Sequence, residues 1–184
     1  MIPSVRLAEF AAIPEKAKKS SVLLLLYKKR ESIFTILILR PEYDGVHSKQ
    51  VSFPGGGFQA SDITLENTAL RETMEEIGIA SSRIQLMGSL SELYIPPSNF
   101  VVKPFVGFTR DMGRLTPDKH EVEEIIEADI NQFMGNRNIK TKKIRIGNGQ
   151  EIQTPYYDVS DFVIWGATAM ILREFSEICS EIEI

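Results

Sequence analysis

Blocks of apolar residues separated by polar segments predict a fold with several strands and two amphipathic helices. Apolar runs at residues 22–27 and 33–39 flank the polar segment KKRES, which predicts two strands joined by a turn. Runs at residues 84–93 and 101–109 lie on either side of YIPPSN and predict two further strands. Residues 121–133 are mixed in character and predict a strand followed by a short helix.

Turn-forming residues separate the remaining extended segments. The segments KKIRI and EIQTPYY flank GNGQ and predict a hairpin whose turn contains Asn148 and Gly149. Residues 41–50 have the composition of a loop. Residues 51–53 predict a short extended segment, which the glycines at 55–57 are expected to end.

Two segments have the 3.6-residue period of amphipathic helices. Residues 64–77 predict a helix with Asp62 or Thr64 as its N-cap and Gly78 just beyond its end. Its expected apolar side consists of Leu70, Met74 and Ile77. Residues 161–179 predict a second helix, which has an apolar side made of Ile164, Thr168, Ile171, Leu172 and Phe175. Because strands and helices alternate irregularly, we expect a mixed α/β (α+β) fold with helices covering a mixed sheet.

Length and composition are typical of one soluble globular domain, residues 1–184. The net charge of −4 argues against a nucleic-acid partner. With Cys179 as the single cysteine, no intramolecular disulfide is possible, which fits a reducing compartment. The N-terminal residues lack the pattern of a signal peptide, and the apolar run at 22–27 is too short to span a bilayer. We therefore expect a cytoplasmic protein that has no membrane partner.

Glu72, Glu75 and Glu76 form an acidic group shortly after a run of three glycines. At about 100° per residue, their side chains cover one arc of the helix, opposite the expected apolar side. One interpretation is a solvated acidic face. The other is a site for a hard cation such as Mg²⁺, which prefers carboxylate oxygens and substrate phosphates as ligands. The glycines favour the second interpretation, because they let the backbone approach a ligand closely.

The segment FPGGGFQASDITLENTALRETMEEIGI resembles the Nudix box, in which a Gly, five residues, a Glu and seven residues precede Arg-Glu-aliphatic-x-Glu-Glu-x-Gly-aliphatic. Gly57 takes the place of the first glycine. The end of the box is matched by Arg71, Glu72, Glu75, Glu76, Gly78 and Ile79. Ile63 stands where the box has its first Glu, and Thr73 replaces an aliphatic residue. We interpret the missing Glu as lost support for the helix start, which Asp62 could supply.

This resemblance implies a Nudix fold, an α/β/α sandwich with a mixed β-sheet, and hydrolysis of a nucleoside diphosphate linked to another group. It also implies a bound Mg²⁺ or Mn²⁺ ion, with Glu72 and Glu76 as the main ligands. Glu75 would be a further ligand or would orient the attacking water. The carbonyl of Gly57 could add a ligand, and Arg71 would position Glu75.

More of the chain is similar to the coenzyme A pyrophosphatases, which are one branch of this family. The segment VHSKQVSFPGG, with its spacing from Arg40, resembles the upstream signature of that branch. Further similar segments are TALRE, LYIPPSNFVVKPFVGF, HEVEEI and IWGATAMIL. The branch implies that the substrate is coenzyme A or an acyl derivative of it.

Several other side chains are candidates for the same site. Arg40 lies in the signature segment, and His47 could contact substrate or only be solvated. Ser98 and Asn99 could line a pocket or cap the turn that follows the double proline. The resemblance places Glu121 beside the metal as an added catalytic acid.

Two sets of alternatives stay open at the level of sequence. A basic run could meet a terminal phosphate or lie on a solvated hairpin edge; it consists of Arg137, Lys140, Lys142 and Lys143. The substrate could also be another nucleoside diphosphate derivative, such as ADP-ribose, or the protein could be a non-catalytic nucleotide-binding module of the same fold. We expect a small nucleotide-derived substrate in either enzyme, and a homodimer is one option for the assembly.

Overall fold

The strand β1 (Lys18–Lys29) lies in the middle of a mixed sheet. A computed structural model describes residues 13–42, 48–135, 138–145 and 151–182. Within this part of the chain, β1 pairs in parallel with β7 (Phe100–Thr109) and antiparallel with β2 (Ser32–Leu39). The other strands of this sheet are β3 (Val51–Ser52), β4 (Gly55–Gly57), β5 (Gln85–Ser89), β6 (Leu93–Ile95) and β8 (Glu124–Asp129).

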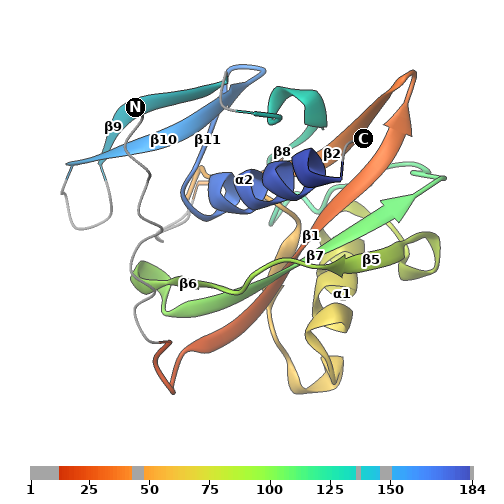
Figure 1. Ribbon diagram of the computed structural model, residues 1–184. Coiled ribbons are helices and arrows are strands. Elements are labelled where there is room, and N and C mark those ends of the chain that lie inside the picture. Colours follow the sequence, from red (N-terminus) through yellow and green to blue (C-terminus); the bar gives the residue numbers. More distant parts are fainter. Residues whose placement is uncertain (1–12, 43–47, 136–137, 146–150, 183–184) are drawn as a thin grey trace.

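A second, antiparallel sheet lies over one face of the first, and two α-helices complete the layers (Figure 1). This sheet has the order β11-β10-β9, with bounds β9 (Ile139–Arg145), β10 (Glu151–Val159) and β11 (Phe162–Trp165). The helices are α1 (Leu65–Ile77) and α2 (Gly166–Glu181). Short 3₁₀ turns lie at η1 (Ala60–Asp62), η2 (Ser81–Arg83), η3 (Pro96–Ser98) and η4 (Ile130–Gln132).

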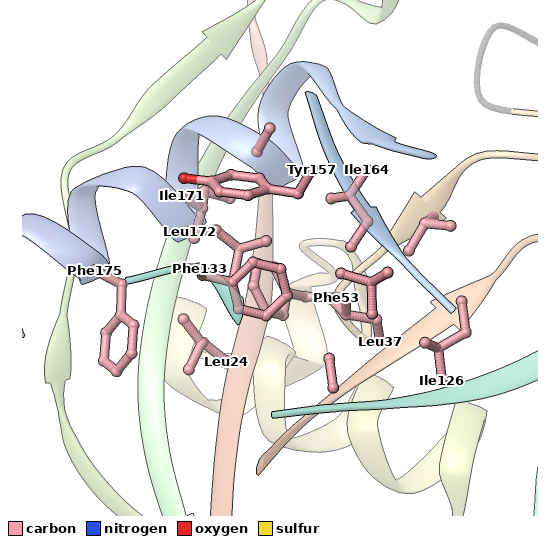
Figure 2. Close-up of a cluster of buried hydrophobic side chains, with 14 of the residues drawn as sticks. Leu24, Leu37, Phe53, Ile126, Phe133, Tyr157, Ile164, Ile171, Leu172 and Phe175 are labelled. Carbon is pink, nitrogen blue, oxygen red and sulfur yellow. The ribbon is translucent and has the colours of Figure 1, made fainter. Parts of the chain in front are cut away.

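Side chains of β1 alternate between two hydrophobic clusters, one on each face of the main sheet. Leu23 and Leu25 pack on the side of α1, whereas Leu24 and Leu26 pack on the side of α2. Such alternation is the consequence of the two-residue period of a strand that is buried on both faces. The α2-side cluster includes Leu24, Leu37, Phe53, Phe133, Tyr157, Ile164, Leu172 and Phe175 (Figure 2). The expected α/β/α sandwich with a mixed sheet is therefore confirmed.

The helix α1 packs through a different face from the one that its apolar residues predict. Leu70 is only partly buried, and Met74 is 49% exposed. The face against the sheet contains Thr68, Ala69, Glu72, Thr73, Glu76 and Ile77. The expectation that the carboxylates lie opposite the packed side is thus wrong for Glu72 and Glu76.

The ends of α1 agree with the expected capping. The side chain of Thr64 accepts a hydrogen bond from the Asn67 N–H, so Thr64 is the N-cap. Gly78 follows the helix with φ 80°, a left-handed conformation that favours glycine. Asp62 is instead the ion-pair partner of Arg71.

Three other boundaries differ from the expectation. The glycines at 55–57 do not end a strand, because they form β4 and pair with β1. The segment 84–93 is not one strand, since it divides into β5 and β6. Residues 162–165 form β11 rather than the start of the last helix, which begins at Gly166. The predicted strand and short helix in 121–133 are confirmed as β8 and η4, while the Asn148-Gly149 turn lies outside the described residues.

In the described part of the chain, the helices are too short or too polar to cross a bilayer.

Candidate metal centre

The carboxylate of Glu76 lies inside the protein, between α1 and the glycine strand β4. The residue is 1% exposed. Its Oε2 accepts a hydrogen bond from the backbone N–H of Gly55 at 2.8 Å. Its Oε1 is buried and has no hydrogen-bond partner in the described part of the chain; the nearest cation is Nη1 of Arg40, at 3.8 Å. Because burial disfavours the charged form, the pKa of Glu76 is raised to about 8.

The glycines of β4 bring the backbone close to these glutamates. Gly55 has φ 155° and lies against Ser21 and Val22 of β1, where a Cβ atom would overlap their backbone. A Cβ atom at Gly56 would overlap the carboxylate of Glu72. The sequence Gly55-Gly56 therefore lets α1 and β4 approach closely enough to enclose both carboxylates.

Glu121 completes a group of three carboxylates. Its loop is attached to the end of α1, because the N–H groups of Thr116 and Asp118 donate to the carbonyls of Ile77 and Glu76 at 2.9 and 3.0 Å. Glu72, Glu76 and Glu121 each present an oxygen, and these oxygens lie within 4.8 Å of one another. Glu72 and Glu76 are buried and Glu121 is exposed, so the group opens to solvent on one side. Burial also raises the pKa of Glu72.

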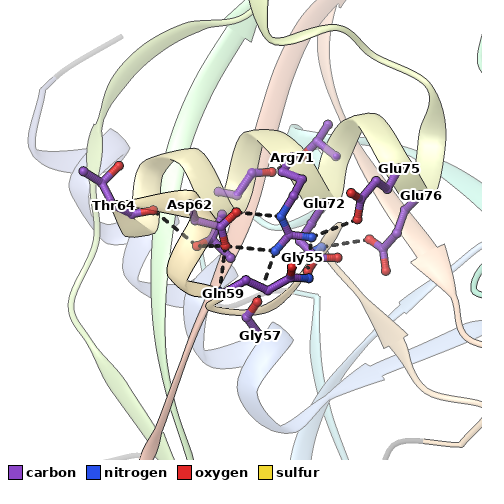
Figure 3. A network of polar contacts seen from close by, with 12 residues as sticks. Gly55, Gly57, Gln59, Asp62, Thr64, Arg71, Glu72, Glu75 and Glu76 are labelled. Atoms are coloured by element: carbon purple, nitrogen blue, oxygen red, sulfur yellow. Dashed lines mark hydrogen bonds and ion pairs between the residues drawn. The ribbon is translucent and has the colours of Figure 1, made fainter.

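Arg71 holds the adjacent carboxylates in place (Figure 3). Its Nε and Nη2 donate to the two oxygens of Asp62 at 2.7 and 3.0 Å, and Nη2 also donates to the carbonyl of Gly57 at 3.1 Å. Its Nη1 contacts Glu75 at 2.8 Å and Glu72 at 2.9 Å. One guanidinium thus connects the start of the helix with the acidic face, and the expected contact between Arg71 and Glu75 is present.

Asp62 is the buried partner of this arginine. Besides Arg71, its carboxylate accepts from the Thr68 hydroxyl and the Gln59 N–H, both at 2.9 Å. The hydrogen bonds from Arg71, with those from Gln59 and Thr68, hold the pKa of Asp62 well below its usual range. The neighbouring residue, Ile63, stands at the position of the first Glu of the box. Its side chain is 81% exposed, and its backbone has φ 66°. Asp62 therefore takes the supporting function that the sequence suggested for it.

Of the residues predicted to bind substrate, one lies beside the carboxylates, two lie in a turn, and one is outside the described residues. Arg40 is beside Glu76. Ser98 ends η3, where its hydroxyl donates to the Ile95 carbonyl, and Asn99 follows it. Asn99 accepts from the Tyr94 hydroxyl and donates to the Lys16 carbonyl. These contacts favour the turn-capping alternative, and a substrate contact by either residue stays a prediction. His47 lies outside the described residues.

Glu75 and Gly57 belong to the network around Arg71 rather than to the group of three carboxylates. Their assignment as metal ligands stays a prediction. Sequence reasoning missed the direct contacts of Gly55 and Gly56 with Glu76 and Glu72. The glycine run indicated a close approach of the backbone. The glutamates were expected on the exposed side of the helix, so the run was not connected with them.

Comparison with known proteins agrees with this arrangement. Residues 17–146 match the family model described as the NUDIX domain. The chain belongs to the Nudix family. Among its curated relatives are Nudix hydrolase 15, mitochondrial, of Arabidopsis thaliana and the uncharacterized Nudix hydrolase NudL of Pectobacterium atrosepticum, each 31% identical. The alignments cover 90% of this chain and 60% of the plant protein, and 77% of this chain and 73% of the bacterial one.

A solved structure supports the fold. The binary complex of a Caenorhabditis elegans Ap4A hydrolase superposes with a TM-score of 0.59 at 15% identity, covering 89% of this chain and 98% of that one. At this identity the similarity concerns the fold. The chain spans 60% of the length of Nudix hydrolase 15 and 55% of that of another relative, Nudix hydrolase 22, chloroplastic, of the same plant.

Proposed function

We propose that this Nudix protein is a divalent-metal-dependent pyrophosphohydrolase that cleaves the diphosphate of coenzyme A or acyl-coenzyme A. The observation that carries the proposal is the group formed by Glu72, Glu76 and Glu121. In it Glu76 is buried, and its Oε1 accepts no hydrogen bond within the described residues and has Arg40 at 3.8 Å as its cationic neighbour. Three carboxylates so close together are unfavourable unless a cation or protons compensate them. Hard divalent cations take such oxygen ligands and commonly share them with substrate phosphates.

The residues present fit a Mg²⁺ or Mn²⁺ ion. Glu72, Glu76 and Glu121 would hold it, and it would supply charge neutralisation for the diphosphate and activation of water. Arg71 keeps Glu75 at the edge of this group, which supports Glu75 as a further ligand or as the group that orients water. Glu121 is exposed beside Glu72 and Glu76, which supports it as the group that would accept a proton from water.

Hydrolysis in this site would be a displacement at phosphorus. Water attacks one phosphorus of the diphosphate and loses a proton to a carboxylate, while the bridging P–O bond breaks. The products from coenzyme A are a phosphopantetheine and an adenosine bisphosphate. The guanidinium of Arg40 lies near Glu76, just after β2, and would bind a diphosphate oxygen. Positioning and charge stabilisation are the main contributions that proteins make to this type of reaction.

The coenzyme A assignment depends on the resemblance of the segments around Arg40, the double proline and IWGATAMIL. Another nucleoside diphosphate derivative, such as ADP-ribose, is the alternative substrate, because the carboxylates and Arg40 would contact only the diphosphate that such molecules share. A binding module without catalysis is disfavoured by the complete set of Glu72, Glu75 and Glu76.

The test combines a substrate panel with two isosteric variants. With Mg²⁺ or Mn²⁺, we expect kcat/KM for coenzyme A to exceed that for ADP-ribose, NADH and nucleoside triphosphates. Glu72→Gln and Glu76→Gln should each lower kcat/KM at least about a hundredfold, roughly 2.7 kcal/mol of barrier. Glu66→Gln, on an exposed position of the same helix, is the matched control.

Two results would contradict parts of the proposal. A tenfold preference for ADP-ribose would move the assignment to the alternative substrate. Near-normal rates in the Glu72 or Glu76 variants, at saturating metal, would remove the metal site. The cytoplasmic location, the lack of nucleic-acid and membrane partners, and a homodimer stay predictions.

A further inference from the structure

The loop that carries Glu121 is fastened to the end of α1 through its backbone. Thr116 and Asp118 provide the two N–H groups that donate to the carbonyls of Ile77 and Glu76. The residue between them is a proline, Pro117, which has no N–H group that would need an acceptor. Asp118 is therefore joined, at 3.0 Å, to the backbone of Glu76, the most buried glutamate of the candidate metal centre.

Asp118 also begins the turn that presents Glu121. Its carbonyl accepts hydrogen bonds from the N–H groups of Glu121 and Val122, at 3.1 and 2.7 Å. Its carboxylate accepts a hydrogen bond from the N–H of His120 at 2.9 Å, which is the arrangement of an Asx-turn. One residue thus contacts the backbone of Glu76 on one side and the backbone of Glu121 on the other.

The chain is held again directly after this turn. Val122 is 2% exposed and belongs to the hydrophobic cluster on the α1 side of the main sheet. The N–H of Glu123 donates to the carbonyl of Leu39, the last residue of β2, at 2.9 Å. Glu121 itself is exposed and lies between these two anchors. The conformation of the turn from Asp118 to Glu121 therefore decides where the Glu121 carboxylate stands.

We propose that Asp118 is a positioning residue for Glu121, because its carboxylate fixes the turn that keeps Glu121 beside Glu72 and Glu76. This inference rests on the proposed function, in which Glu121 would accept a proton from the attacking water. Asp118 acts as a hydrogen-bond acceptor and not through its charge, since the group of close carboxylate oxygens consists of Glu72, Glu76 and Glu121. Small displacements of a reacting group lower the rate strongly, so a loosened turn is expected to affect turnover.

Two substitutions at the same position separate geometry from charge. Asp118→Ala removes the acceptor of the Asx-turn, whereas Asp118→Asn keeps an oxygen acceptor and removes the charge. With coenzyme A and saturating Mg²⁺, we expect kcat of Asp118→Ala to fall about tenfold while KM stays within about twofold. The kcat of Asp118→Asn should stay within about threefold of that of the unmodified protein.

Asp129→Ala is the matched control. Asp129 is half-buried like Asp118, and its carboxylate accepts the same type of hydrogen bond, from the N–H of Asn131 at 2.9 Å. Asp129 ends β8 and has no contact with the loop that carries Glu121 in the described part of the chain. An unchanged kcat in Asp118→Ala, or an equal fall in Asp129→Ala, would overturn the inference. An equal fall in Asp118→Ala and Asp118→Asn would also overturn it, because the charge of Asp118 would then be what matters.

Amide hydrogen exchange of the metal-free protein separates this inference from the proposed function. In Asp118→Ala, the N–H groups of Glu121 and Val122 should exchange about tenfold faster or more, whereas Asp118→Asn and Asp129→Ala should leave them nearly unchanged. If the unmodified protein hydrolyses no nucleotide, the proposed function fails, and the exchange rates alone then decide whether Asp118 holds the turn. Equal exchange at these two amides in Asp118→Ala and in the unmodified protein would overturn the positioning of Glu121 by Asp118.

Discussion

Glu76 is a carboxylate that the fold keeps almost completely out of water. One oxygen has a backbone donor, Gly55, and the other has no hydrogen bond in the described residues and lies 3.8 Å from Nη1 of Arg40. Burial disfavours the ionised form, which is why the pKa of Glu76 is raised to about 8. The same burial that disfavours the charge in isolation makes the site selective for a ligand that brings positive charge.

Asp62 and Ile63 are neighbours with opposite environments, and this leads to a residue-scale prediction. Asp62→Asn removes the charge that two nitrogens of Arg71 contact, so it should destabilise the protein by about 3 kcal/mol. It should also lower kcat, because Arg71 would no longer be fixed beside Glu75.

Ile63→Glu restores the box glutamate on an exposed side chain and should change stability by less than about 0.5 kcal/mol. Urea denaturation and steady-state kinetics of both variants measure these effects.

Activity separates the two positions further. Ile63→Glu should change the rate by less than about tenfold, equivalent to 1.4 kcal/mol of barrier. A hundredfold gain would show that the natural protein is a weakened enzyme and would favour the binding-module alternative. An Asp62→Asn protein with unchanged stability would show that Arg71 does not depend on this partner.

At the scale of elements, the position of α1 could be predicted from the sequence, but its orientation could not. The capping residues Thr64 and Gly78 define the ends, and the structure has both. Apolarity favoured the side with Leu70 and Met74, whereas the buried face contains Thr73 and two glutamates. Burial of those groups depends on partners from β4, which lie outside the helix and are not part of its periodicity.

Other elements show the same division between local and tertiary information. The strands β1, β2 and β7 follow from their own apolar runs. The glycines of β4 have no strand propensity and pair only because β1 lies beside them. The sequence pattern also assigns β11 to the last helix, because the apolar residues of 161–179 continue the helical period. In the structure the strand ends at Trp165 and the helix begins at Gly166. In the site, box spacing identified Glu72 and Glu76, while the contacts with Gly55 and Gly56 required the fold.

The close contact between β4 and α1 gives a prediction at this scale. Gly56→Ala would place a methyl group where the Glu72 carboxylate lies, so one of the two elements has to move. We expect a loss of about 1–3 kcal/mol in the free energy of unfolding and a fall of more than about tenfold in kcat/KM. Gly88→Ala in β5 is the control, because a Cβ atom there meets nothing within 4 Å. If Gly56→Ala behaves like Gly88→Ala, the packing of Glu72 against β4 is not required for activity.

At the scale of the whole molecule, separate parts of the chain converge on one acidic site. The end of β2 supplies Arg40, α1 supplies two glutamates, and the loop before β8 supplies Glu121. The second sheet shares a core with the main sheet through Tyr157, Val159 and Ile164. This shared core supports the interpretation of the chain as one domain, residues 1–184, which stays a prediction.

The stability of the metal-free protein should depend on pH with an unusual sign. The pKa of Glu76 is raised to about 8 in the folded protein, against a value of 4.5 for an ordinary Glu. Between these values the folded state keeps a proton that the unfolded state releases, so stability falls as pH rises from about 4.5 to 8. The slope approaches about 1.4 kcal/mol per pH unit for one carboxyl group. Asp62 does not oppose this change, because its depressed pKa affects stability only below the ordinary Asp range.

A divalent cation should reverse this dependence, and thermal denaturation at several pH values tests it. Metal binds the deprotonated carboxylates, so its affinity rises as the proton leaves Glu76, and ligand binding to the folded state raises its stability. We expect Tm without metal to fall between pH 5 and 8, and the increase in Tm caused by excess Mg²⁺ to grow over the same range. Glu76→Gln should remove most of the fall and most of the response to Mg²⁺, whereas Glu66→Gln should retain both. A metal-free protein whose Tm rises steadily from pH 5 to 8 would show that Glu76 is ionised without a cation, and the physical argument for the metal centre would then fail.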